Sequence, residues 1–386
     1  MESFRLPGSL LWKEEKLFMS KSKVYFTNMH TTSSENLLQK LERLMRTAGI
    51  EAIDFHKKYA AIKIHFGEPG NLSYLRPNYA RAVADVVKKL GGHPFLTDCN
   101  TLYVGGRKNA LEHIESAYIN GFTPYTTGCH IIIGDGLKGN DDVPVPVSNG
   151  EYIKEAKIGR AIMDADIIIS LTHFKCHECT GIGGTIKNLG MGCGSRGGKM
   201  EMHSNGKPFV NQEACVGCGM CTKNCAHSAI TVNDRKASVD HEKCVGCGRC
   251  IGACPMDAVC SENNEANDIL SYKIAEYAKA VVEDKPQFHI SLVIDVSPFC
   301  DCHPENDSPI IPDVGMFASF DPVALDLACA QAALKQPILS GSRLDGMPKD
   351  YEDHFTNTHP VTNWRAQIDH GEKIGLGHTD YELIEI

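Results

Sequence analysis

The chain has 386 residues, a net charge of −9 and 42% hydrophobic residues, so two or three structural units are expected rather than one core. The modest negative charge, without a basic stripe, argues against nucleic acid or a membrane surface as a partner, and no apolar run approaches the roughly 18 residues that span a bilayer. The 17 cysteines do not indicate a disulfide framework, because the chain is long and carries no recognisable secretory signal.

Strands and helices are predicted to alternate along the first half of the chain. We expect residues 1–18 to be an appendage. The continuous apolar run 166–171 is typical of a central parallel strand that is covered on both faces. The alternation therefore predicts an α/β fold with a mostly parallel sheet flanked by helices. Strands are predicted at 24–27, 60–65, 93–97, 131–133 and 166–171, and helices at 37–48, 77–90, 107–119 and 158–164.

The same pattern returns after an interruption. A helix is predicted at 268–282, a strand at 288–296, and a helix from the Asp321-Pro322 pair to about 334. The tail beyond residue 336 has no assignment. Because 263–386 holds too few strands for a sheet of its own, we expect one α/β domain (19–206 and 263–386) with an inserted domain at 207–262. Three domains in series remain the alternative.

Two cysteine runs dominate this insertion. Residues 215–219 recur as 244–248, and each run has bacterial-ferredoxin spacing, in which three close cysteines hold one [4Fe–4S] cluster and the fourth ligates the other. The glycines suit tight turns around a cluster. A zinc ribbon would need only four ligands. An inserted α+β ferredoxin-like domain is predicted, with cluster I on Cys215, Cys218, Cys221 and Cys254, and cluster II on Cys225, Cys244, Cys247 and Cys250.

Polar side chains follow several of the predicted strands. In open α/β sheets, ligands bind beyond the carboxyl ends of strands. His65 and Glu68 could act as base and acid, or could simply brace a loop by hydrogen bonding. The residues that follow these strands include Lys63, His65, Glu68, Asp98, His173, Lys175, His177, Cys300, Cys302 and His303.

Residues 181–192 are rich in glycine and carry one lysine and one amide, Lys187 and Asn188. We interpret them as a tight turn in which Gly183 and Gly184 bring backbone N–H groups, together with Lys187, against a carboxylate or phosphate. The alternative is a loop that packs against the cluster domain. The order of residues excludes a Walker loop.

A third metal ion is a further possibility. Cysteine and histidine are good ligands of transition metals, but adjacent ligands and the Cys300-x-Cys302 step are tighter than usual zinc spacing. Reduced thiols and polar histidines are the alternative. The candidates are His173, Cys176, His177, Cys179, Cys300, Cys302 and His303, whereas Cys99, Cys129, Cys260 and Cys329 are expected to be buried thiols.

From residue 23 onward the chain resembles the DUF362 proteins that carry an inserted double-cluster domain. The resemblance implies no defined reaction. It implies that Cys176 and Cys179 are peculiar to this chain, which leaves His177 and Lys187 the stronger site candidates. The step from His177 to Lys187 also resembles one loop of lactate racemase-type proteins. The family segments are 63–71, 98–103, 172–178, 183–192, 300–302 and 319–324.

Together these patterns predict an iron–sulfur protein that passes electrons to or from an anionic small-molecule pocket. It could be an oxidoreductase in the cytoplasm of an anaerobe, because such clusters need a reducing interior. A redox partner protein or a small-molecule substrate would be its partner. A non-enzymatic electron carrier and a cofactor-maturation factor are the alternatives. The predicted catalytic residues are His65, His177 and Lys187, and the predicted ligand-binding residues are Lys63, Glu68, His173, Lys175, Gly183, Gly184 and Asn188.

Overall fold

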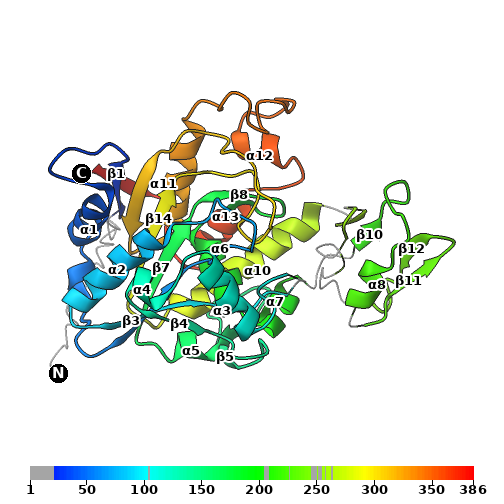
Figure 1. Cartoon of the computed structure of the whole chain (residues 1–386), viewed down its shortest axis with the longest axis horizontal. Helices are drawn as coiled ribbons and strands as arrows, with labels where there is room; N and C mark the ends of the chain where they lie inside the picture. The colour runs from blue at the N-terminus through cyan, green and yellow to red at the C-terminus, as the bar shows by residue number, and fades with distance from the viewer. Residues whose placement is uncertain are drawn as a thin grey trace, which may run out of the picture.

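A computed structural model describes residues 21–102, 105–203, 208–225, 227–244, 250, 254–256, 258–261 and 264–386. Its centre is an eight-stranded sheet (Figure 1). The order across the sheet is β16 (Tyr381–Glu385), β1 (Ser22–Asn28), β15 (Gly315–Ser319), β14 (Gln287–Val293), β7 (Ile167–His173), β2 (Tyr59–Lys63), β3 (His93–Asp98) and β4 (His130–Ile133).

The sheet is mostly parallel. β4, β3, β2, β7 and β14 pair in parallel, β15 is antiparallel to both β14 and β1, and β16 is parallel to β1. Only β15 therefore runs against the other strands of this sheet. The predicted α/β fold with a mostly parallel sheet is confirmed.

Helices cover both faces of the sheet. Successive residues of a strand point to opposite faces, so Ile169 packs with α1 (Leu37–Thr47) and α2 (Pro77–Lys89), whereas Ile168 packs with α6 (Thr185–Cys193), α10 (Asn264–Val282) and α11 (Pro322–Leu334). The largely apolar run 167–171 is thus explained by burial on two sides.

Two predicted helices differ from those in the structure. Residues Glu155–Gly159 form β6, which pairs with β5 (Asp142–Pro146), because Ala156 and Ile158 alternate inward. This leaves only α5 (Arg160–Met163) of the helix predicted at 158–164. The helix predicted at 107–119 begins at α3 (Ala110–Ile119), where the Asn109 side chain caps it, and α4 (Pro124–Thr127) follows it.

The C-terminal tail completes the sheet. After α12 (His354–Thr358), α13 (Ala366–Lys373) packs on α10 and α11, and β16 then pairs beside β1. None of these elements was predicted. In the part of the chain that the structure describes, no helix combines the length and the apolar character that crossing a bilayer requires.

The cysteine-rich segment projects to one side of the sheet (Figure 1). β10 (Pro208–Val210) pairs with β13 (Val259–Ser261), which brings the two ends of the segment together. Between them lie α8 (Met220–Asn224) and the hairpin of β11 (Ile230–Asn233) with β12 (Lys236–Val239). Because the large sheet takes strands from before and after this segment, the arrangement agrees with an insertion. The boundaries at 207 and 262 and the appendage 1–18 fall outside the described residues.

Candidate functional site

A cavity of about 900 Å³ opens at the carboxyl ends of the central strands. β2 lies between β7 and β3, so the chain order reverses direction between β2 and β7, where open α/β sheets bind their ligands. Most of the predicted site residues meet at this point. The lining includes Lys63, His65, Glu68, Lys175, His177, Gly183, Gly184, Lys187 and Asn188, together with Asp98, Arg107, Cys300, Cys302 and His303.

The predicted glycine-rich turn is instead a short hairpin followed by a helix. β8 (Lys175–His177) pairs with β9 (Gly181–Gly183), and α6 starts at Thr185. A Cβ on Gly190 would lie 2.0 Å from the Ile274 carbonyl oxygen, and one on Gly192 would lie 2.4 Å from Lys63 Nζ. These glycines therefore allow close packing of α6 on α10 and passage of the Lys63 side chain, rather than a turn.

A carboxylate from the protein itself, that of Asp326, is bound at the N-terminus of α6. The Asp326 carboxylate accepts the N–H groups of Thr185 at 2.6 Å and Ile186 at 2.9 Å. Gly184 is needed beside it, since a Cβ there would lie 2.5 Å from the carboxylate oxygens. Burial raises the pKa of Asp326 to about 6. These two amides are therefore occupied by Asp326, whereas Gly183, Gly184 and Lys187 of the group predicted to hold an external anion line the cavity.

A buried ion pair lies on the cavity wall. Lys63 Nζ contacts Asp98 Oδ1 at 3.0 Å and donates to Asn188 Oδ1 at 2.7 Å, while the Asn188 amide nitrogen donates to Thr172 Oγ1 at 3.0 Å. Although burial favours the neutral acid, the Lys63 ammonium holds the pKa of Asp98 well below its usual range. Lys63 and Asn188 are thus fixed in place by each other and by Asp98.

A second buried pair joins Glu68 to Arg107, with Arg107 Nε donating to the carboxylate at 2.7 Å. No local sequence pattern predicts a role for Arg107. His65 Nδ1 accepts the Gly67 N–H at 3.0 Å, and burial lowers the pKa of His65 well below that of a free histidine. His65 is therefore neutral, and its Nε2 carries the proton. The Glu68 carboxylate is paired with Arg107 and holds the loop in place, which argues against a role for Glu68 as a free acid.

His173 lies beside this cavity but does not line it. Its Nδ1 faces Asp301 Oδ1 at 2.9 Å, and its Nε2 faces the Ile294 carbonyl oxygen at 2.9 Å. Lys175 Nζ contacts the other Asp301 oxygen at 3.2 Å. Both ring nitrogens of His173 face acceptors, so this side chain positions the loop after β14. Its predicted ligand contact stays untested.

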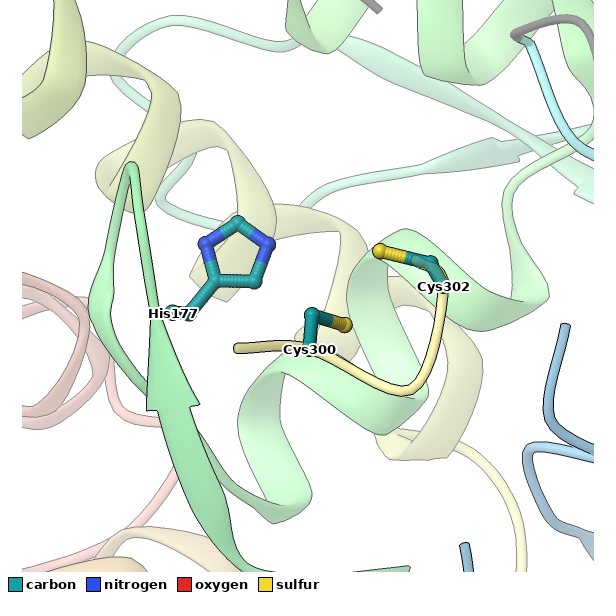
Figure 2. A group of neighbouring side chains, drawn as sticks. All are labelled: His177, Cys300 and Cys302. Carbon is teal, nitrogen blue, oxygen red and sulfur yellow. The ribbon is translucent and has the colours of Figure 1, made fainter. Parts of the chain in front are cut away.

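A thiol pair occupies the loop after β14. The ligand atoms of His177, Cys300 and Cys302 all lie within 4.8 Å of one another, and Figure 2 shows the two sulfurs beside the imidazole. Lys187 Nζ lies 3.6 Å from Cys300 Sγ. A hydrogen bond from Cys302 lowers the pKa of the Cys300 thiol well below its usual value, against burial and with help from Lys187 and His177. The same bond raises the pKa of Cys302.

The predicted third metal ion would use these residues. The structure brings His177, Cys300 and Cys302 together, and Cys179 and His303 only into overlapping groups through Glu178, whereas neither Cys176 nor His173 is in such a group. His177 Nδ1 accepts the N–H groups of Cys179 at 3.1 Å and Thr180 at 3.3 Å. The proton of the neutral ring is therefore on Nε2, which lies 3.4 Å from Glu178 Oε1, and the ring also donates a hydrogen bond to Cys300. In this arrangement His177 does not fit a metal.

The rim of the cavity carries an ion pair. His303 Nε2 lies 2.9 Å from Glu178 Oε1, and Glu305 lies 3.6 Å from His303 Nδ1. Burial opposes the charged ring, but the hydrogen bond and the charge of Glu178, together with the charges of Cys300 and Glu305, outweigh it and raise the pKa of His303 to about 9. The rim histidine is thus cationic at neutral pH.

In the cysteine-rich segment, the four residues predicted to hold cluster I line one cavity, and Cys254 comes to it from the second run. Gly217 (φ +68°) and Gly219 (φ +76°) supply the turns, and a Cβ on Gly217 would lie 2.4 Å from the Arg235 carbonyl oxygen. The four are Cys215, Cys218, Cys221 and Cys254.

Backbone N–H groups point at the cysteine sulfurs. Ala229 N–H donates to Cys225 Sγ at 3.2 Å, and the repeat-equivalent Ala258 N–H donates to Cys254 Sγ at 3.3 Å. Such bonds stabilise thiolates and tune a cluster. Together with the shared cavity, they fit the residues of cluster I to a [4Fe–4S] group. For cluster II, Cys225, Cys244 and Cys250 are described, whereas Cys247 lies outside the described residues.

The two cavities share two residues. Cys254 and Pro255 line the small cysteine cavity and also the large cavity at the strand ends. A ligand of the predicted cluster I therefore forms part of the wall of the pocket that holds Lys187, His177 and Cys300.

The fold and the site define a protein with an α/β sheet that carries a ferredoxin-type segment, and comparison with known proteins identifies its family. The model of the family "Domain of unknown function (DUF362)" matches residues 60–331. The chain belongs to this family.

Relatives share only parts of the chain. The thylakoid-associated protein sll1697 of Synechocystis is 27% identical over 125 residues, 32% of this chain and 35% of its own length. The ferredoxin-type protein NapF of Haemophilus influenzae is 47% identical over 38 residues, 10% of this chain and 22% of its own. The chain thus spans about a third or less of these relatives. The NapF match supports iron–sulfur binding by the cysteine-rich segment.

Two solved structures are also similar. The lactate racemase apoprotein from Thermoanaerobacterium thermosaccharolyticum is 10% identical with a TM-score of 0.35, covering 70% of this chain and 51% of that one. A protein from Thermotoga maritima is 11% identical with a TM-score of 0.34, covering 88% of this chain and 59% of that one. At these scores the likeness carries no argument about function.

Proposed function

We propose that this protein is an iron–sulfur redox protein whose two [4Fe–4S] clusters exchange electrons with an anionic small molecule in the large cavity. The observation that carries the proposal is that Cys254, a ligand of cluster I, also lines that cavity. Cluster I is held by Cys215, Cys218, Cys221 and Cys254, and cluster II by Cys225, Cys244, Cys247 and Cys250.

The cavity has the size and the charge for such a ligand. Small-molecule sites measure roughly 300–1,000 Å³, and this cavity is about 900 Å³. Lys187 and Arg343 line it, and Arg343 stacks on the Phe299 ring at 4.5 Å. The Lys63 and Arg107 charges are already paired with Asp98 and Glu68. Lys187 and Arg343 are therefore the proposed contacts for an anionic group.

The bound clusters would supply one-electron transfers, and the chain itself must guide protons to the ligand. His65 and His177 both carry a proton on Nε2 by the hydrogen-bond argument above, and both line the cavity. They are proposed to donate Nε2–H hydrogen bonds to the ligand and to position the water that protonates it, because a neutral imidazole does not give up this proton. Lys187 would offset the negative charge that a ligand gains when it takes up an electron.

Electrons would enter through the exposed residues around cluster I. Cys218 is exposed there, and Val216, Met220 and Met256 are partly exposed apolar residues around the same cavity. An apolar patch of this kind suits a transient redox partner protein. The same patch supports the second candidate, a non-enzymatic electron carrier, which would not need Lys187. Because reduced clusters and thiols need a reducing compartment, we place the protein in the cytoplasm of an anaerobe.

The clusters are tested by iron and sulfide analysis with electron paramagnetic resonance on anaerobically purified protein. About eight iron atoms per chain are expected from two cubanes. Cys254→Ser should lose the signal of one cluster. Iron at a single atom per chain, with tetrahedral sulfur ligation, would instead indicate a mononuclear site and end the proposal.

The anionic pocket is tested by alkylating Cys300 with iodoacetate and with neutral iodoacetamide. Lys187→Met should lower the iodoacetate-to-iodoacetamide rate ratio by about tenfold, while iron content stays constant. Loss of Lys187 also changes the fraction of Cys300 that is thiolate, and this change affects both reagents alike. The rate ratio therefore reports only the attraction of the charged reagent. Lys154→Met, an exposed lysine outside the cavity, is the control. An unchanged ratio in the Lys187 variant would favour the simple electron carrier.

A further inference from the structure

We propose that Cys300 and Cys302 form a redox-active dithiol that cycles to a disulfide and passes electrons from the iron–sulfur segment to a small anionic disulfide in the cavity. This inference rests on the proposed function, because the clusters are its source of electrons. It names the group at which one-electron transfer becomes two-electron chemistry, and the chemical class of the substrate.

The loop after β14 places the two sulfurs for bond formation. The His303 N–H donates to the Cys300 carbonyl oxygen at 3.1 Å, so Cys300 to His303 form a tight turn. The sulfurs lie within 4.8 Å of each other and both residues line the cavity (Figure 2). A disulfide needs the sulfurs to approach to about 2.05 Å, which a rotation about the side-chain bonds of this short turn can provide.

The surroundings of Cys300 set it apart from the other thiols. Cys99 donates to the Cys193 carbonyl oxygen, and burial raises the pKa of both thiols, as it does for Cys129, Cys176 and Cys179. Cys300 instead has the Lys187 ammonium at 3.6 Å and a hydrogen bond from His177. A cation and a donor beside a thiolate are the features of reactive cysteines.

The exchange step balances as thiol–disulfide chemistry. The Cys300 thiolate attacks one sulfur of a disulfide RS–SR′, the S–S bond breaks, and R′S⁻ leaves, stabilised by a hydrogen bond from His177 Nε2–H, and takes a proton from water. Cys302, after losing its proton to water, then attacks the Cys300 sulfur, RS⁻ leaves and is protonated, and the Cys300–Cys302 disulfide forms.

The return step consumes two electrons and two protons. The Cys300–Cys302 disulfide accepts one electron at a time and becomes two thiols, so the net reaction is RSSR′ plus two electrons and two protons to RSH and R′SH. The two clusters together hold the two electrons required. Lys187 offsets the negative charge after the first electron.

A metal ion is the competing use of the same side chains. A Cys₂His set with an open position would resemble a catalytic zinc site. It would require the Nε2 lone pair of His177, whereas the two backbone donors at Nδ1 place the proton on Nε2. It would also place a cation against the Lys187 ammonium. Both contacts favour the dithiol.

Disulfide formation is tested on the anaerobically purified full chain. The protein is treated with diamide, quenched in acid and alkylated, and the peptide that contains residues 300–302 is analysed by mass spectrometry. An internal disulfide is expected in the wild type and in the control Cys129→Ser, and none in Cys302→Ser. If both cysteines are alkylated after diamide, or if a stoichiometric metal is present in the wild type and lost in Cys302→Ser, the inference is overturned.

Electron coupling is tested separately. Diamide-oxidised protein receives limited dithionite, and cluster absorbance and the disulfide peptide are followed together. The clusters should re-oxidise as the disulfide disappears, with about two electrons per disulfide. Cys302→Ser, or Cys302→Ala if the serine variant misfolds, should leave the clusters reduced. A persistent disulfide beside reduced clusters would refute the inference and leave the proposed function intact. A disulfide in a chain without clusters would refute the coupling and the proposed function together.

The substrate class is tested with dithiobis(nitrobenzoate), a small anionic disulfide that releases a coloured thiolate. The reduced full chain should rapidly reduce about two molecules of it, one with the dithiol and one with the two cluster electrons, and Cys300→Ser should slow this at least about tenfold. Cys129→Ser should behave as the wild type. Equal rates in the wild type and Cys300→Ser would show that the thiol pair has no part in disulfide reduction.

Discussion

The α/β part and the cysteine-rich segment are held together by different forces. The α/β part buries apolar residues on both faces of its sheet, in two large clusters. The cysteine-rich segment has a much smaller core, and cysteines are prominent in it. Its buried members among the described residues are Cys215, Cys221, Ile230, Ala237, Cys250, Ala258 and Val259. Two-stranded sheets with so little apolar burial are marginal in water.

The two regions therefore keep their functional side chains in place in different ways. The cavity side chains are fixed by a self-sufficient sheet and by buried pairs such as Lys63 with Asp98 and Arg107 with Glu68. The cysteines are fixed mainly by the group they bind, because metal binding and folding are coupled in such segments. One region prepares the chemistry, and the other depends on its cofactor for its fold.

The largest expected effect comes from removing iron. After oxidation with ferricyanide and chelation, amides of 208–261 should lose their protection from hydrogen exchange, while those of β2 and β7 keep theirs. The stability at stake can be on the order of 10 kcal/mol in small metal-folded domains. Hydrogen-exchange mass spectrometry reads both regions in one sample. Equal loss of protection in both would abolish the distinction between them.

A smaller effect is expected inside the α/β part from Lys63→Met. The Asp98 carboxylate would remain buried without its cation, which costs about 3–5 kcal/mol. Urea unfolding measures the change, and Lys58→Met, a partly exposed lysine at the start of the same strand, should stay within about 0.5 kcal/mol. The double variant Lys63→Met with Asp98→Asn should recover much of the loss. No recovery would mean that the ion pair is not the cause.

The same pair predicts a pH dependence. The pKa of Asp98 is lowered in the folded protein, so its contribution is present above the unfolded value of about 4 and is lost as the pH falls below it. The wild type should therefore lose more stability below about pH 4 than the double variant. Parallel slopes in the two proteins would assign the acid sensitivity to other groups.

Features that depend on neighbouring residues, such as the cysteine ligands and the buried strands, could be predicted from the sequence. The cysteine runs carry their ligand spacing within a few residues, and the strands 60–65 and 166–171 show their burial in their own composition. The convergence of Lys63, His177 and Cys300 also followed from one rule, that parallel strands end at the same edge of a sheet.

What sequence could not predict depends on distant partners. Asp326 caps α6 from a helix far along the chain, and Arg107 pairs with Glu68 across two loops. Glycines inside a helix cost about 1 kcal/mol each relative to alanine, so the composition of 181–192 predicts a turn. Close packing of Gly190 on Ile274 outweighs that cost. Such tertiary contacts leave no mark in the neighbouring sequence.

The smallest expected effect concerns the His303–Glu178 pair at the cavity rim. This pair belongs to the α/β part and does not depend on a cofactor, unlike the cysteine-rich segment. Glu178 raises the pKa of His303 in the folded protein to about 9, against the effect of burial. The pair therefore stabilises the fold fully below the unfolded pKa of histidine, about 6.5, and this contribution is lost as the pH rises through about 9. A nuclear magnetic resonance titration of the His303 ring should show this midpoint. Glu178→Gln should move it down by more than Glu305→Gln, because Glu178 lies at 2.9 Å and Glu305 at 3.6 Å. A midpoint near 6.5 in the wild type would mean that the rim pair is not formed in solution.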